Sequence, residues 1–210
     1  MKRILLFAAL LALTACGGNQ NKATQAADPS EATTPSAEQF AKMQELYENA
    51  DDDHGWMPLC KWQYVDLDGD GIDEVWMRDK DDEYGAMFSL ADGTVSLIGI
   101  ETDRFPAFTR EQKDGKGYFC KAGAAGGPSY YTEIITVKDS RVAERFNLLE
   151  VYGEVDGAGL NGKDIGAEEA RAYTAALPES KELVPGEWNI LDLTEYDRVP
   201  DLDNSAQDAK

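Results

Sequence analysis

Three aspartates alternate with glycine and leucine in the stretch DLDGDGIDE, residues 66–74. Carboxylates held this close repel one another, by roughly 1 kcal/mol per pair at about 4 Å in water and by more where water is excluded. A divalent cation converts this repulsion into attraction, and Ca²⁺ accepts about six to eight oxygen ligands in loose geometry. The spacing therefore predicts a calcium site made by one short loop.

The expected ligands occupy alternate positions of this loop. They are the backbone carbonyl of Ile72 and the side chains of Asp66, Asp68, Asp70 and Glu74. Gly71 stands at the sixth position, where such a loop turns sharply and a residue without Cβ fits best. The alternative is an acidic, glycine-rich hairpin turn without metal, because Asp and Gly favour turns in any case.

The loop resembles DxDxDG loops of known calcium-binding proteins. It matches the first nine positions of an EF-hand loop, but Met77 stands where an EF-hand has its twelfth-position glutamate. The flanking segments KWQYV and EVWMR are rich in aromatic and β-branched residues, which favour strands over paired helices. The stretch is therefore more similar to the DxDxDGxxE loops of FG-GAP and related extracellular β-repeat proteins. It also resembles uncharacterised bacterial lipoproteins that carry such a loop after a strand, which implies calcium binding but no activity.

The elements around the loop predict an α+β fold, mainly an antiparallel β-sheet meander with an N-terminal helix and a short C-terminal helix. After the loop, strands are expected at 84–90, 94–100, 105–110, 116–122, 129–137, 140–149 and 186–193. The dipeptides Asp92-Gly93, Asp114-Gly115 and Asn161-Gly162 favour tight turns. The small residues of 123–128 predict a loop. A single domain is expected over residues 36–199.

Two helices are expected to pack on the sheet. Ser36 and Gln39 form a capping-box pattern that predicts a helix from about 37 to 50. Its apolar face would carry Phe40, Met43, Leu46 and Tyr47. The second helix is expected at 167–177.

The first 15 residues have the features of a signal peptide. Lys2 and Arg3 precede an apolar run, Ile4 to Leu13, that is too short to span a bilayer. The following LTAC, residues 13–16, resembles a bacterial lipobox, which implies that Cys16 is lipidated. Acyl chains such as palmitate on Cys16 would anchor the chain to a membrane. The alternative is an ordinary secretory signal with a chance cysteine.

The segments on either side of the domain favour a tethered envelope protein. By resemblance to lipoproteins of Gram-negative bacteria, Gly17 and Gly18 after the cysteine favour the outer membrane over the inner one. Residues 16–35 would then be the lipidated cysteine and a flexible tether, because no large apolar side chain follows Cys16 there. Residues 200–210 are expected to be an acidic disordered tail. Cys60 and Cys120 remain as an even pair, either joined by a disulfide or left as two buried free thiols.

Composition excludes some functions and leaves two. A net charge of −20 argues against nucleic-acid binding, which needs clustered Lys and Arg. His54 is the only histidine, and no GxSxG or P-loop pattern is present, so no catalytic residue is assigned. We expect a non-enzymatic, calcium-binding, lipid-anchored envelope protein that binds or scaffolds an envelope protein or glycan. The alternative is a hydrolase of polysaccharide or peptidoglycan that uses two carboxylates about 5 to 10 Å apart.

Overall fold

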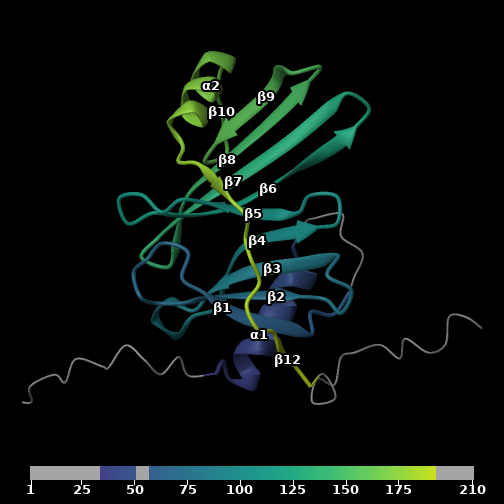
Figure 1. Ribbon diagram of the computed structural model, residues 1–210, viewed down its shortest axis with the longest axis vertical. Helices are drawn as coiled ribbons and strands as arrows, with labels where there is room; N and C mark the ends of the chain where they lie inside the picture. The colour runs from purple at the N-terminus through teal and green to yellow at the C-terminus, as the bar shows by residue number, and fades with distance from the viewer. Residues whose placement is uncertain (1–33, 51–56, 193–210) are drawn as a thin grey trace, which may run out of the picture. The chain divides into compact units, whose positions relative to one another are not determined.

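The computed structural model describes residues 34–50 and 57–192 of the chain (Figure 1). These residues belong to one unit of the chain, Ala32–Lys210. The signal peptide, Cys16, most of the tether, His54 and the acidic tail lie outside the described residues. In the described part, neither helix has the length and apolar content that a membrane crossing needs.

The first sheet contains the predicted loop and has the strand order β12-β1-β2-β3-β4, with every described pairing antiparallel. Its strands are β1 (Lys61–Val65), β2 (Glu74–Arg78), β3 (Tyr84–Ser89), β4 (Ser96–Thr102) and the short β12 (Asn189–Ile190). A 3-10 turn, η1 (Ala91–Gly93), joins β3 to β4. Asp92 and Gly93 there both have positive φ, which agrees with the predicted tight turn.

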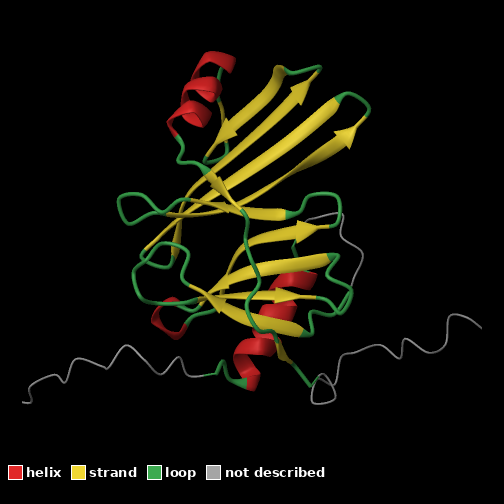
Figure 2. Cartoon of the chain, viewed as in Figure 1, coloured by secondary structure: helices red, strands yellow, loops and turns green. Residues whose placement is uncertain are grey.

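The second sheet has the order β10-β9-β8-β7-β6-β5-β11 and is also antiparallel (Figure 2). Its strands are β5 (Ala107–Arg110), β6 (Gly117–Gly126), β7 (Ser129–Lys138), β8 (Arg141–Val151), β9 (Glu154–Leu160), β10 (Lys163–Asp164) and β11 (Ser180–Lys181). Helix α2 (Ala167–Ala176) follows β10. The protein is thus an α+β molecule built mostly from antiparallel sheets.

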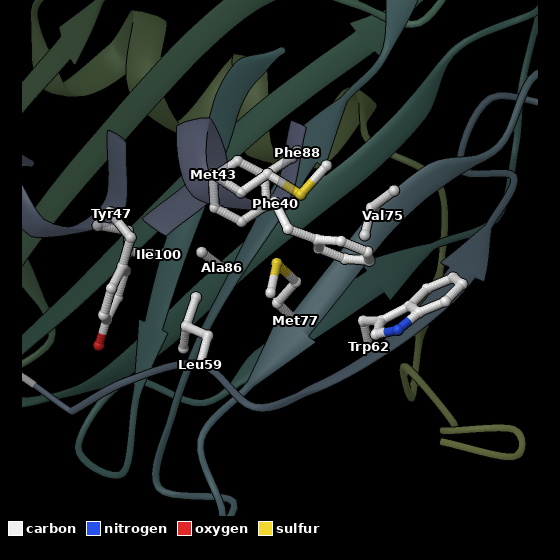
Figure 3. Close-up of a cluster of buried hydrophobic side chains, with 10 residues drawn as sticks. All are labelled: Phe40, Met43, Tyr47, Leu59, Trp62, Val75, Met77, Ala86, Phe88 and Ile100. Atoms are coloured by element: carbon white, nitrogen blue, oxygen red, sulfur yellow. The ribbon is translucent and has the colours of Figure 1, made fainter. Parts of the chain in front are cut away.

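Helix α1 (Ala37–Glu48) begins where the capping box predicts. The Ser36 hydroxyl accepts from the Gln39 amide, and the Gln39 side chain accepts from the Ser36 amide. Its buried side chains, Phe40, Met43 and Tyr47, pack into a cluster with residues of β1 to β4 (Figure 3). The other members of that cluster are Leu59, Trp62, Val75, Met77, Ala86, Phe88 and Ile100.

The opposite face of the first sheet packs against the second sheet. Trp76, Met87 and Ile98 share a buried cluster with Phe119 and Ile135 of β6 and β7. Leu67, from the predicted metal loop, belongs to the same cluster and is buried. The loop is therefore fixed to the core between the sheets by its own second residue.

The other face of the second sheet is covered by α2. The rings of Phe146 and Tyr173 are stacked there, with centroids 4.3 Å apart and 16° between their planes. Ala170 of α2 is fully buried in the same cluster as Cys120 and Ile134. The second sheet is therefore covered on one face by α2 and, over part of the other, by the first sheet.

Several details differ from the sequence-based expectations. The small residues Gly123 to Gly126 extend β6 and do not form a loop, because they pair with β7 up to Ser129. Strand β9 was not predicted, and the strand expected at 186–193 is reduced to the two residues of β12. Cys60 and Cys120 are both free in the structure, but only Cys120, in β6, is buried as the second alternative expected; Cys60, in the segment before β1, is partly exposed.

Candidate metal centre

The predicted loop joins β1 to β2 as a hairpin, and Val65 pairs with Glu74 across its base. The expected order of strand, loop and strand is confirmed. Gly71 has φ +82°, so the sixth position does require a left-handed backbone. One carboxylate oxygen from each of Asp66, Asp68 and Asp70 lies within 4.8 Å of the others. These three side chains form a cluster that could hold a metal ion.

The three carboxylates are held in place by hydrogen bonds that converge on them. Each of their six oxygens accepts one bond, and five of the six donors are backbone amides. Asp66 accepts from Gly69 and Gly71, Asp68 from Asp70 and Ser140, and Asp70 from the Ile72 amide and the Ser140 hydroxyl. A carboxylate offers about four lone-pair sites, so two bonds per group orient it and leave sites for a cation.

Glu74, the ninth residue of the loop, is the most buried of the expected ligands. Its Oε2 accepts from the Leu67 amide at 2.9 Å, while its Oε1 is buried and has no hydrogen-bond donor. Burial is the main cause that raises the pKa of Glu74, to about 7; hydrogen bonding from the Leu67 amide and from the Ser140 hydroxyl lowers it, and the charges of Asp68 and Asp70 raise it further. An unpaired buried oxygen of this kind costs about 1 to 3 kcal/mol or more unless a partner is supplied.

Glu74 does not belong to the group of three aspartates that lie within 4.8 Å of one another. In a loop of this type the ninth position often reaches its ion through a water molecule. A more distant carboxylate with one unpaired oxygen fits that role. The residues present therefore fit a cation with direct aspartate ligands and a glutamate behind them.

Ile72 was expected to contribute only its backbone carbonyl. Its side chain is exposed, and its carbonyl oxygen lies 3.4 Å from the Ser140 hydroxyl. The same hydroxyl lies 3.3 Å from Asp70 Oδ2, so it lies beside two of the expected ligand groups. Its single proton can be donated to only one of them at a time.

Two residues outside the loop that form hydrogen bonds with it were missed by sequence reasoning. Ser140, in the turn between β7 and β8, donates its amide to Asp68 Oδ2 at 3.0 Å. Gln112 donates its side-chain amide to the carbonyls of Asp66 and Leu67, both at 3.0 Å. No local pattern could have identified either residue, because each lies at least 45 positions along the chain from the loop.

Gly117, the first residue of β6, explains how closely the second sheet approaches the loop. A Cβ at this position would overlap the backbone carbonyl of Leu67. Only glycine permits this distance between β6 and the loop. Gly117 lies inside the predicted strand 116–122, and a glycine within a strand was the only sequence signal. It does not say which segment comes close.

Among the surface grooves formed by the described residues, two adjoin the loop region. One has a volume of about 520 Å³ and is lined by Asp66, Glu111 and Gln112 among others. The other, about 480 Å³, includes Ser140, Asp92 and Arg141. No aromatic side chain lines either groove, and Glu111 is paired with Lys181 at 3.5 Å. The grooves therefore give no specific support to the hydrolase alternative.

Comparisons with protein-family models, with curated proteins and with solved structures found no match to this chain.

Proposed function

We propose that the protein is a calcium-binding module of the bacterial cell envelope whose ion stabilises the fold and takes no part in a reaction. The observation that carries the proposal is the convergence of three aspartate carboxylates within 4.8 Å of one another. Without a cation, three neighbouring negative charges oppose the folded loop. With a cation, the same charges favour it.

The donor set favours calcium over other ions. The three aspartates, the Ile72 carbonyl and Glu74 offer only oxygen atoms, and no histidine or cysteine joins the group among residues 34–50 and 57–192. Zinc and copper prefer nitrogen and sulfur ligands, whereas oxygen suits magnesium and calcium. Magnesium requires nearly ideal octahedral geometry and keeps much of its water, while calcium accepts the irregular ligands of a short loop.

The location belongs to the proposal as well. We infer from the lipobox-like LTAC that Cys16 carries the lipid anchor and that the outer membrane is the more favoured site. The tether would hold the calcium-stabilised domain away from the bilayer, where it could bind an envelope protein or a glycan. A purely binding or scaffolding role accords with the lack of a recognisable catalytic motif in the sequence.

The test is thermal unfolding of the full-length chain, purified in detergent, with calcium and with a chelator. A ligand at about 100 times its Kd stabilises the folded state by about 2.7 kcal/mol. For a domain of this size that corresponds to a rise in the unfolding midpoint of about 5 to 10 °C. Magnesium at the same concentration should raise the midpoint less.

Asp70→Asn is the informative variant, because it removes one charge and keeps the shape of the side chain. The calcium-dependent rise should shrink or disappear in this variant. Asp81→Asn, on the exposed turn between β2 and β3, is the matched control and should respond as the unaltered chain does. Equal midpoints of the unaltered chain with calcium and with chelator would refute the proposal.

A further inference from the structure

The β1–β2 loop, which contains the proposed cation site, contacts the second sheet at Ser140, in the turn between β7 and β8. Besides its amide bond to Asp68 and its hydroxyl contact with Asp70, this residue accepts a hydrogen bond at its carbonyl from the Ser89 hydroxyl of β3. Ser140 is fully buried, although it lies in a turn. Its amide, hydroxyl and carbonyl are thus all directed at the first sheet.

Ser140 has a left-handed backbone conformation, which allows it to make these contacts. Ser140 and the preceding Asp139 have φ values of 52° and 50°, in the left-handed region that residues other than glycine seldom adopt. Two successive left-handed residues reverse the chain between β7 and β8. This reversal directs the Ser140 amide at Asp68 Oδ2 and places its hydroxyl beside Asp70.

A second observation at this loop, the unpaired oxygen of Glu74, also indicates a missing ligand. Glu74 is fully buried, and its Oε1 has no hydrogen-bond donor, although Asp68 and Asp70 lie close enough for their charges to act on it. An unpaired carboxylate oxygen beside two further carboxylates is a position where a cation, or water bound to one, would be strongly favoured.

We propose that Ser140 is a positioning residue of the cation site, so that the site is completed by the second sheet and the bound ion fastens the β7–β8 turn to the β1–β2 loop. The inference rests on the proposed calcium site. By donating to Asp68 Oδ2 and Asp70 Oδ2, Ser140 orients two of the ligand carboxylates, and each carboxylate keeps further lone pairs for the ion. Because coupling between two sites is reciprocal, an ion that orders these aspartates must also strengthen the docking of Ser140.

The first test is the calcium affinity of Ser140→Gly in the full-length chain, measured by calorimetric titration. Glycine accepts the left-handed backbone and keeps the amide bond to Asp68, so only the hydroxyl is lost. We expect the affinity to fall about fivefold, the effect of about one hydrogen bond. The unfolding midpoint without calcium should not fall, because glycine relieves the strain of the positive φ.

Tyr152→Gly is the matched control. Tyr152 also has a left-handed backbone, φ 54°, in the β8–β9 turn of the same sheet, and it is exposed. Its replacement should leave the calcium affinity unchanged. A loss of affinity in Ser140→Gly alone would therefore be due to the hydroxyl and not to a glycine in a turn.

The second test follows hydrogen exchange of the Ser140 amide, which a purely structural serine would not couple to calcium. In the unaltered chain, calcium should slow this exchange at least tenfold, and the Asp68→Asn variant should lose the effect. If the unaltered chain binds calcium but Ser140→Gly binds equally well and the exchange does not respond, the inference is wrong and the proposed site stands. If the unaltered chain does not bind calcium, both fail.

Discussion

Asp68 is a buried carboxylate that lies close to two other carboxylates. Its side chain is almost fully buried, and burial raises the pKa of its carboxyl, while the amides of Ser140 and Asp70 lower it. The nearby charges of Asp70 and Asp66 raise the pKa again. Two amide donors thus favour the ionised form, but the repulsion between aspartates remains. A divalent cation would remove that repulsion, which no hydrogen bond within the loop can do.

The two cysteines provide a residue-level prediction that does not involve the metal. Burial raises the pKa of the Cys120 thiol to about 12, and it also raises the pKa of Cys60, which is only partly buried. Since the thiolate is the reactive form, a thiol reagent at pH 8 should modify Cys60 first. Cys120 should react only when the chain unfolds. Mass spectrometry of the modified peptides gives the order, and equal rates for the two thiols would contradict the burial of Cys120.

The pH dependence of stability follows from the same raised pKa. The folded state keeps the Cys120 proton up to about pH 12, whereas the unfolded state releases it near pH 9. The contribution of this group is therefore complete below about pH 9 and is lost as the pH rises toward 12. In the Cys120→Ala variant, urea unfolding should show a smaller loss of stability over this interval.

At the scale of elements, the sequence predicted correctly those features that depend only on residues close together in the chain. The capping box at Ser36 predicted the start of α1, and the Asp-Gly and Asn-Gly pairs predicted turns that do have positive φ. The spacing of the aspartates likewise predicted their convergence, because all three lie on one nine-residue hairpin. Each of these features is decided within about ten residues.

Features that depend on distant contacts could not be predicted. The split into two sheets after β4 and the burial of Leu67 between them depend on how the strands pack. The contribution of Ser140 to the site depends on a contact between residues 72 positions apart. Gly123 to Gly126 favour a loop by composition, but pairing with β7 holds them in a strand, so tertiary context outweighed propensity.

The close approach of β6 to the loop gives a prediction at the scale of elements. Gly117→Ala would force the Leu67 carbonyl away, since the added methyl group overlaps it. We expect a loss of about 1 to 3 kcal/mol in the free energy of unfolding, typical of overpacking, together with weaker calcium binding because the loop is displaced. Urea unfolding and calorimetric titration measure the two effects.

Gly157→Ala is the control for this change. Gly157 lies in β9 of the same sheet, and a Cβ there would meet nothing within 4 Å. Its replacement should change the free energy of unfolding by no more than about 0.5 kcal/mol. If Gly117→Ala proves equally harmless, the loop and β6 are not packed as closely as described.

At the scale of the whole molecule, the excess of acidic residues and the proposed membrane anchor would act together. A chain with a net charge of −20 repels itself and also resists association with other copies. The proposed calcium ion would offset two of these charges where three aspartates are concentrated. The proposed anchor would then fix such a domain at a surface, and the acidic exterior would favour partners that are neutral or basic.

The proposed lipid anchor predicts the behaviour of the Cys16→Ser variant. Without a thiol at position 16 no acyl chain can be attached, so the variant should move from the membrane fraction to the soluble fraction when cells are fractionated. Cys60→Ser should remain with the membrane and serves as the control. If Cys16→Ser stays in the membrane fraction after its signal peptide has been cleaved, the lipobox interpretation is wrong.

The most direct measurement of the central claim is calorimetric titration of the full-length chain with calcium after thorough chelation. The account predicts saturable binding of one ion per chain, which is lost when Asp66, Asp68 and Asp70 are all replaced by Asn. Absence of saturable binding to the unaltered chain, or binding that survives the triple replacement, would contradict it.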